Sequence, residues 1–347
     1  MAIEREDASP PVGLQAYAAP WWLPGGHLQT IWSARLSRPW VGPPPAWRRE
    51  RWTTADDDFI DVDFLDPPMS GRQGVARTLV LFHGLEGSSH GHYSLAFAAQ
   101  ARQRGLGFAV PHFRGCSGEM NRARRAYHSG DHAEVGWMLH RLKQRTPGRM
   151  WAVGISLGGN ALLRWAQEAG VAAAATVDAV AAVCSPLDLA AAGRAIDTGF
   201  NRQVYARMFL ATMKPKALAK WQQHPGLFDA EQVRRARTLA AFDDAFTAPL
   251  HGFDGVADYW ARASALPHMK RLHLPTLVVH ARNDPFIPAS SLPRRDEVAD
   301  NVTLWQPAGG GHVGFASGGP PGHLGALPHA VLDWMATQDL APPGERQ

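Results

Sequence analysis

The sequence predicts an α/β fold: a mostly parallel, twisted sheet with helices on both faces and a helical cap insert. Two observations lead to this prediction. Short apolar runs typical of buried strands alternate with segments of helical periodicity, the pattern of a parallel sheet with crossover helices. Between residues 188 and 268 the strand pattern stops and helical segments follow one another, as in an insert that covers a site.

Composition narrows the class of protein. The chain has 347 residues, of which 45% are hydrophobic and 19% charged, in agreement with a large soluble domain. The formal net charge is +4 and no Lys/Arg block occurs, which argues against a nucleic-acid partner. Two cysteines cannot build a disulfide framework, residues 1–10 do not resemble a signal peptide, and the apolar stretch at 171–183 is too short to span a bilayer. We therefore expect a cytoplasmic protein without a membrane anchor.

Residues 1–46 are expected to be an N-terminal arm and an aromatic-rich segment that packs on the body. Residues 1–20 look like a flexible arm. The segment 20–32, PWWLPGGHLQTIW, is rich in aromatic and turn residues, and we interpret it as a cover for apolar surface. A contribution to the mouth of a pocket is the alternative.

The core is expected at 47–187 and 269–340, on both sides of the cap insert at 188–268. A hairpin is expected at 47–64, where apolar residues alternate with acids as in a half-buried strand and Asp56 to Asp58 form a solvated turn. Asp131 and Glu134 have the spacing of a capping box. The other strands are expected at 78–82, 108–110, 151–153, 177–183, 276–280 and 302–305. Helices are expected at 93–104, from 131 onward, at 160–169 and at 324–337. The tail at 342–347 is expected to be disordered.

Within the insert, apolar residues recur with helical spacing. We interpret this stripe as packing between helices rather than as substrate contacts. Its members are Val204, Tyr205, Met208, Phe209 and Met213.

Residues 151–160, WAVGISLGGN, hold the strongest chemical signal. The pattern G-x-S-x-G lies between an apolar run and a helical segment, which is the strand–turn–helix context that a nucleophilic serine needs. Glycines at 154, 158 and 159 relieve the clashes of a sharp turn. We expect Ser156 to be held above the sheet, next to the positive end of a helix.

Two further polar residues follow strands. Asp284 comes after the strand at 276–280 and His312 after the last strand, and the carboxyl ends of parallel strands meet at one edge of a sheet. The order Ser, Asp, His is that of the α/β-hydrolase arrangement. Histidine can take the serine proton and return it to the leaving group, and a carboxylate fixes the imidazole tautomer.

Each assignment has a rival. Asp188 also follows a strand, but Asn-Asp-Pro around Asp284 is a tighter strand-end turn. His323 and His329 fall in or beside the last helix, whereas His312 directly follows a strand. We therefore favour Asp284 and His312.

An oxyanion would be stabilised by backbone N–H donors. One is expected at Leu157, at the start of a helix, and the other at Leu85, in the turn after the strand at 78–82. The alternative for this turn is an ordinary glycine turn without chemistry, and His83 within it is expected to shape the turn.

No metal or cofactor is expected. His128, Asp131, His132 and Glu134 are close in sequence, but capping explains the two acids and no His-x-x-x-His pair occurs.

Several linked motifs from about residue 20 to 337 resemble the α/β-hydrolase branch that includes the bacterial YheT-type esterases and the animal hydrolases related to them. The resemblance implies that Ser156, Asp284 and His312 are nucleophile, acid and base, and that HGLEG is the oxyanion loop. It also implies hydrolysis of carboxylic esters with short or medium acyl chains, without a cofactor. The motifs are PWWLPGGHLQTIW, HGLEGSSHGHYS, FRGCSGE, YHSGD, GISLGGN, FDDAFTAPLHGF with DYW, ARNDPFIP and GGGHVGF.

We therefore predict a serine carboxylesterase that acts on a small-molecule acyl ester. A thioesterase, lipase or peptidase of the same fold, and a non-catalytic member that binds a ligand or partner, remain alternatives. The sequence assigns no chemistry to the PWWLPGGHLQT and FRGCSG segments.

Overall fold

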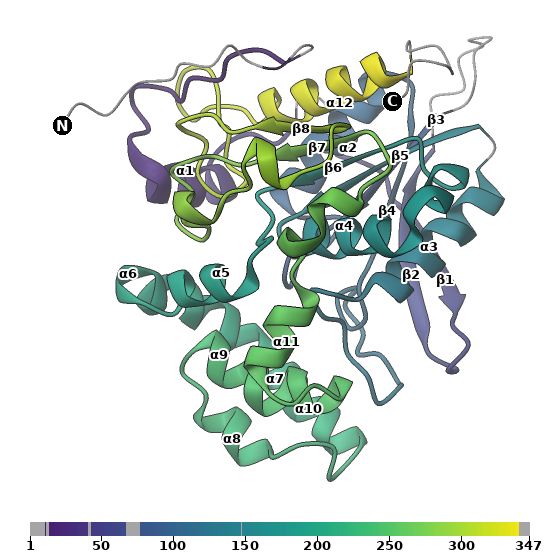
Figure 1. Cartoon of the computed structure of the whole chain (residues 1–347), viewed down its shortest axis with the longest axis vertical. Coiled ribbons are helices and arrows are strands. Elements are labelled where there is room, and N and C mark those ends of the chain that lie inside the picture. Colours follow the sequence, from purple (N-terminus) through teal and green to yellow (C-terminus); the bar gives the residue numbers. More distant parts are fainter. Residues whose placement is uncertain (1–10, 12–13, 41–42, 67–76, 147, 340–347) are drawn as a thin grey trace.

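A computed structural model of the protein describes residues 11, 14–40, 43–66, 77–146 and 148–339, and within them eight strands form one sheet (Figure 1). The strand order is β1-β2-β4-β3-β5-β6-β7-β8. The pairs β1–β2 and β2–β4 are antiparallel and the others parallel, which confirms the mostly parallel sheet. The strands are β1 (Arg48–Thr53), β2 (Phe59–Leu65), β3 (Arg77–Phe82), β4 (Gly107–Pro111), β5 (Arg149–Ile155), β6 (Ala179–Val183), β7 (Thr276–Val279) and β8 (Val302–Trp305).

Helices cover both faces of the sheet. In β3, Val80 and Phe82 join one buried cluster with α3 (His132–Arg145) and α4 (Leu157–Ala169). Leu79 and Leu81 join another with α2 (His92–Gln103) and α12 (Ala326–Gln338). Because both faces are buried, β3 is a continuous apolar run rather than an alternating one.

The expectation of a half-buried β2 is wrong, because its acidic residues are buried as well. Asp61 and Asp63 are 2% and 1% exposed. Arg51 of β1 binds Asp61 at 2.7 Å and Arg49 binds Asp63 at 2.6 Å. The neighbouring strand thus supplies the counter-charges that allow carboxylates inside the protein.

The turn at Asp56 to Asp58 is exposed at Asp56 and Asp57, as expected, but Asp58 is only 1% exposed because Arg114 covers it. The Arg114 guanidinium donates to Asp58 at 2.7 Å and to Glu134 of α3 at 2.6 Å. Glu134 is therefore occupied by Arg114, and Asp131 pairs with Arg125 at 2.5 Å, so the predicted capping box does not form. The FRGCSG segment thus ties the hairpin turn to α3.

Between β6 and β7 the chain is helical, and this part is called the helical insert below. In Figure 1 it lies apart from the sheet, at the bottom of the view. A buried apolar cluster holds it together and also includes Phe286, Ile287 and Leu292, which follow β7. Its helices are α5 (Leu189–Ile196), α6 (Gly199–Asn201), α7 (Arg207–Gln223), α8 (Ala230–Arg235), α9 (Leu239–Phe242), α10 (Ala248–His251) and α11 (Val256–Ala263), with π-helical turns η2 (Arg202–Ala206) and η3 (Asp243–Thr247). Its last element is the 3₁₀ turn η4 (Leu266–Arg271), which leads into β7. Short 3₁₀ turns elsewhere are η1 (Gly170–Ala175), η5 (Ala289–Ser291) and η6 (Arg295–Glu297).

The aromatic-rich segment near the N-terminus contains a helix, α1 (Gly25–Arg35), where the sequence indicated turns. The preceding residues also pack on the body: Leu14 is buried, and the Tyr17 hydroxyl donates to the Ala316 carbonyl at 2.7 Å. A flexible arm is therefore wrong for residues 14–20. The rest of the expected arm, 1–10 and 12–13, and the tail 342–347 lie outside the described residues.

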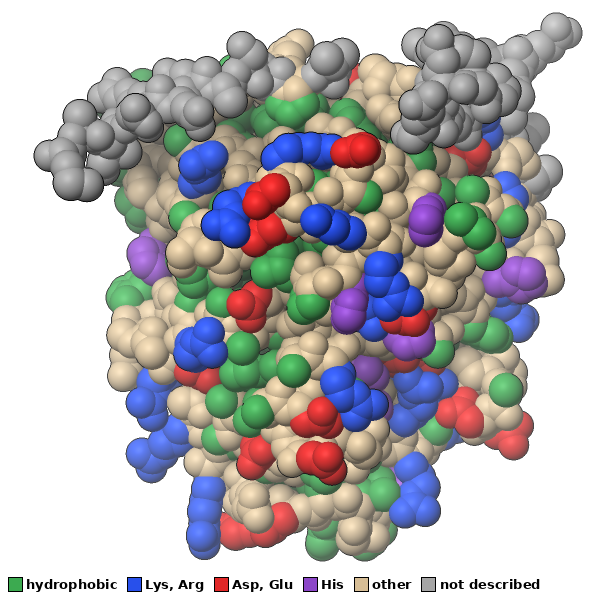
Figure 2. Space-filling model, in the orientation of Figure 1, with side chains coloured by type: hydrophobic (Ala, Val, Ile, Leu, Met, Phe, Trp, Pro, Cys, Tyr) green, Lys and Arg blue, Asp and Glu red, His purple; other side chains and the backbone are tan. Residues whose placement is uncertain are grey.

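Charged groups are mixed over the surface in view. Figure 2 shows Lys and Arg side chains interspersed with Asp and Glu on this face rather than gathered in one patch. Among the described helices, none combines the length and the apolar character that crossing a bilayer requires.

Candidate active site

Ser156 lies on a strained turn between β5 and α4. Its backbone φ of 53° is in the left-handed region, which is costly for a residue with a side chain. The neighbouring glycines permit the turn: a Cβ on Gly154 would lie 2.3 Å from the Gly159 Cα, and one on Gly158 would lie 2.5 Å from the His83 carbonyl oxygen. The expected sharp turn is therefore present.

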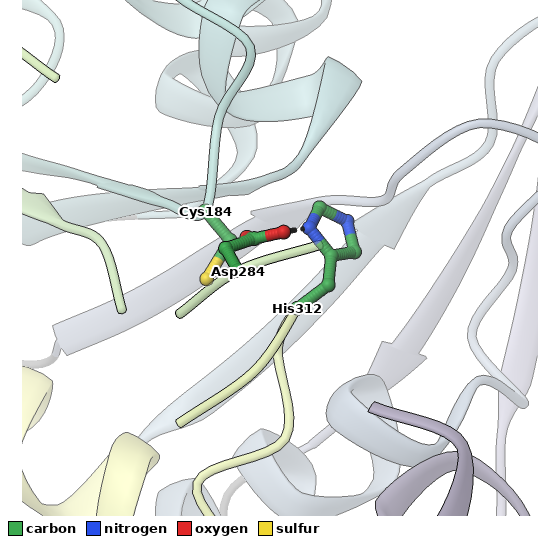
Figure 3. A group of neighbouring side chains, drawn as sticks. All are labelled: Cys184, Asp284 and His312. Atoms are coloured by element: carbon green, nitrogen blue, oxygen red, sulfur yellow. Dashed lines mark hydrogen bonds and ion pairs between the residues drawn. The ribbon is translucent and has the colours of Figure 1, made fainter. Parts of the chain in front are cut away.

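His312 lies within hydrogen-bonding distance of both other residues predicted to cooperate, Ser156 and Asp284. The Ser156 hydroxyl and His312 Nε2 are 3.0 Å apart, and His312 Nδ1 lies 2.8 Å from Asp284 Oδ2. Figure 3 shows the carboxylate pointing at the imidazole. The Asp284 side chain is fully buried, and its other oxygen accepts from the Phe286 backbone N–H at 2.8 Å. This assigns Nδ1 as the protonated nitrogen and leaves Nε2 free to accept from Ser156.

The rival residues have other partners. Asp188 caps α5 by accepting from the Ala191 N–H at 2.9 Å. His323 lies beside Ser317, with 3.3 Å between its ring nitrogen and the hydroxyl, and His329 pairs with Asp333 at 3.0 Å. The structure thus brings Asp284 and His312, and none of these three, to Ser156.

His83 holds a turn, as expected. Its Nδ1 donates to the Gly84 carbonyl at 2.8 Å, and its Nε2 accepts from the Phe113 N–H at 3.1 Å. Complete burial lowers the pKa of His83 to about 3, so the ring stays neutral and keeps this tautomer.

Cys184 is a neighbour of the site that the sequence did not predict. Its sulfur and the reactive atoms of Asp284 and His312 all lie within 4.8 Å of one another (Figure 3). Burial raises the pKa of the thiol well above its ordinary value, so it is protonated, and the carboxylate and imidazole already bind each other. The trio therefore fits an acid–base pair beside a thiol better than a set of metal ligands. The one feature of the sequence that could have indicated Cys184 is its position directly after β6.

Two backbone N–H groups near Ser156 are candidates for oxyanion donors. Within the described part of the chain, neither the Leu157 nor the Leu85 N–H is bonded to an acceptor. The N–H groups on either side of Leu85 are used: Gly84 donates to Tyr93 and Glu86 to Tyr127, both at 3.0 Å. Leu85 is thus the residue of this turn whose N–H remains for a ligand.

Ser156 opens into a pocket between the core and the helical insert. The pocket holds about 1100 Å³ of empty space, part of it open to solvent. Phe209 and Met213 line it, and both also pack against the buried apolar cluster of the insert, as expected. Further apolar walls come from Leu189, Ala192, Ile196, Leu239, Phe242 and Phe246.

The pocket also contains charged groups. Lys216 of α7 pairs with Glu86, in the turn that follows β3, at 2.8 Å. Burial raises the pKa of Asp243 to about 6, although Thr247 and Trp260 donate hydrogen bonds to its carboxylate. A mostly apolar wall with a few polar groups is typical of sites for small organic ligands.

Comparison with known proteins identifies the family of the fold. Residues 77–318 match the family described as alpha/beta hydrolase fold. A protein of Escherichia coli (strain K12) named "Putative esterase YheT" is 37% identical over 315 residues, 90% of both chains. The mouse protein named "Phospholipase ABHD3" is 28% identical over 308 residues, 84% of this chain and 74% of the relative.

Solved structures show the same fold at low identity. The Pyrococcus furiosus esterase Pf2001 superposes with a TM-score of 0.53 at 14% identity, over 87% of this chain and 97% of the esterase. A bacterial membrane phospholipase A gives a TM-score of 0.53 at 15% identity, over 85% of this chain and 87% of the other. The protein therefore belongs to the alpha/beta hydrolase fold family, in the branch that includes YheT.

Proposed function

We propose that the protein is a carboxylic ester hydrolase that works through an acyl-enzyme on Ser156. The single observation that carries the proposal is the continuous hydrogen-bond path from the Ser156 hydroxyl through His312 to the buried Asp284 carboxylate. A serine hydroxyl is a weak nucleophile near neutral pH, and such a path supplies the base that it lacks.

In the first half of the reaction, the Ser156 oxygen attacks the ester carbonyl carbon while its proton passes to His312 Nε2. The oxyanion that forms is held by the Leu157 and Leu85 N–H groups, each worth about 3 kcal/mol in the transition state. As the bond to the alcohol breaks, His312 returns the proton to the leaving oxygen. Water then repeats these steps on the acyl-enzyme and releases the acid.

The pocket supports an acyl ester as substrate. Its walls are mainly apolar, which fits a hydrocarbon acyl chain, and the ester carbonyl would lie at Ser156. The name of the mouse relative adds phospholipid esters to the compounds that need testing. Both cysteines are free thiols, in agreement with the reducing cytoplasm as the working compartment.

Replacement of the serine tests the proposal. With p-nitrophenyl butyrate, Ser156→Ala should lower kcat by at least about 10⁴-fold, and a fluorophosphonate probe should label only the unmodified protein, at Ser156. A rate unchanged by Ser156→Ala would reject the proposal, and an unlabelled, inactive protein would indicate a binding member of the fold. Parallel assays with thioesters, peptides and phospholipids test the other acyl substrates.

A further inference from the structure

The loop that carries His312 has an unusual backbone. Four of its residues have positive φ angles, which glycine adopts freely but which are costly at Val313 and Phe315 and persist there only where the surroundings fix the backbone. The angles are 141° at Gly310, 60° at Gly311, 56° at Val313 and 45° at Phe315.

Gln29 of α1 supplies part of that fixation. Its side-chain oxygen accepts from the Gly310 N–H at 2.7 Å and from the Asn283 amide at 2.9 Å, and its own amide donates to the Leu23 carbonyl at 2.9 Å. Gln29 is 4% exposed. One buried oxygen thus joins the loop of the base to the turn that carries the acid.

Thr30, the next residue of α1, holds the histidine itself. Its hydroxyl accepts from the His312 backbone N–H at 2.8 Å and donates to the Gly26 carbonyl at 2.7 Å. The N–H of Gly311, the residue between Gly310 and His312, donates to the Asn283 side chain at 2.9 Å. Three successive N–H groups of the loop are therefore bound by Gln29, Asn283 and Thr30.

The backbones around these bonds are in direct contact. A Cβ on Gly26 would lie 1.8 Å from the Asn283 carbonyl oxygen, and one on Gly314 would lie 2.5 Å from that of Gln29. Figure 1 shows α1 beside the loops that follow β7 and β8. Substitution at either glycine would push α1 away from the loops.

We propose that Gln29 and Thr30 are positioning residues, which align the His312 imidazole between Ser156 and Asp284 from a helix that precedes the whole sheet. The inference rests on the proposed function. It gives the HLQT part of the N-terminal segment a role: this segment orients the general base, and does more than cover apolar surface. Displacement of a catalytic group by about 1 Å costs on the order of 10²-fold in rate.

The test uses Thr30→Val, which keeps the shape of the side chain and removes the acceptor for the His312 N–H. It should lower kcat on p-nitrophenyl butyrate by about 10- to 100-fold with KM changed less than threefold, and slow fluorophosphonate labelling of Ser156 by the same factor. Thr30→Ser restores the hydroxyl and should recover most of the rate. Gln29→Met, which removes the bridge between the two loops, should resemble Thr30→Val.

Ser33→Ala is the matched control. Ser33 is buried on the same helix, and its hydroxyl has no partner within the described residues. This variant should retain the rate. A normal kcat in Thr30→Val, failure of Thr30→Ser to recover, or an equal loss in Ser33→Ala would overturn the inference.

Hydrogen exchange separates this inference from the proposed function. In Thr30→Val and Gln29→Met the amides of residues 310–312 should exchange at least about tenfold faster, while those of β5 and β6 stay protected. If the unmodified protein has no activity that depends on Ser156, the proposed function fails and exchange alone decides whether α1 fixes the loop. Unchanged exchange in both variants would refute the positioning role.

Discussion

The loops at the carboxyl ends of the strands and the helical insert next to them are held in different ways. In the loops, single residues are held in defined positions. Ser156 lies on a turn with a positive φ, and His312 is held by hydrogen bonds to polar side chains. In the insert, buried rings such as Phe242 and Phe246 pack on one another at 5.2 Å between centroids. Hydrogen bonds set directions closely, whereas apolar packing sets volume and tolerates substitution. Under the proposed function, we expect the loops to carry the residues of the reaction and the insert to select the substrate.

The two regions meet at polar contacts. Besides the pair of Lys216 and Glu86, Lys220 of α7 donates to the carbonyl oxygens of Asn121 and Ala123, at 2.6 and 2.9 Å. Desolvation by burial lowers the pKa of Lys220 to about 8. The predictions below ask whether the regions can be changed separately.

The largest effect is expected from Asp284→Asn. The amide keeps the size of the carboxylate but presents an N–H group to the imidazole or favours its wrong tautomer, so kcat should fall by about 10³- to 10⁴-fold. The measurement is turnover of p-nitrophenyl butyrate, with circular dichroism as the control for folding. A loss below tenfold in a folded variant would contradict the role of Asp284.

In the insert, Phe246→Ala should affect stability and selectivity. Phe246 is 9% exposed and packs against Phe228 at 4.9 Å between centroids, so the cavity should cost about 3 kcal/mol of unfolding free energy in urea. The larger pocket should shift the preferred ester to a longer acyl chain. A small fluorophosphonate should still label Ser156 within threefold of the normal rate, and a loss as large as that of Asp284→Asn would abolish the distinction between the regions.

The ion pair of Glu86 and Lys216 should couple the regions weakly. The Lys216 side chain is 35% exposed and that of Glu86 10%, so a double-mutant cycle with Glu86→Gln and Lys216→Gln should give about 1 kcal/mol or less at low salt. The same cycle on Glu231 and Arg235, an exposed pair within α8, is the control and should give less. Coupling above 3 kcal/mol would show that the insert and the turn after β3 act as one unit.

The smallest effect is a pH dependence from Asp243. Burial raises its pKa in the folded protein to about 6, above the 3.8 of a free side chain. The folded state then binds more protons than the unfolded state between these values, so this group's contribution to stability decreases as pH rises from about 4 to about 6. In thermal unfolding, the Tm of Asp243→Asn should therefore fall less than that of the unmodified protein as the pH rises from about 4 to about 6, by a few degrees. Parallel curves for both proteins across this range would contradict the assignment.

Much of the fold could be predicted because its signals are local. Continuous apolar runs such as 78–82 and 151–153 indicate strands buried on both faces, and the structure has strands there. Ser156, Asp284 and His312 were predicted from a motif and from their positions after strands, and their side chains do lie together. Their catalytic roles, the oxyanion donors and the borders of the insert stay predictions.

The wrong or missing predictions share a cause: the local sequence does not show which distant residue a polar side chain will contact. Asp61 and Asp63 looked solvated in the sequence because nothing local shows that Arg51 and Arg49 neutralise them across the hairpin. Nothing in the sequence indicated that Cys184 lies beside Asp284.

The sequence alone determined most strands and helices of the core and the three residues whose side chains lie together at Ser156, because periodicity and glycine placement act over a few neighbours. Only the tertiary structure decided how these three side chains are held. The bond between Gln29 and Gly310 joins residues 281 positions apart, and a contact over such a distance follows from the way the chain folds back on itself rather than from any local pattern.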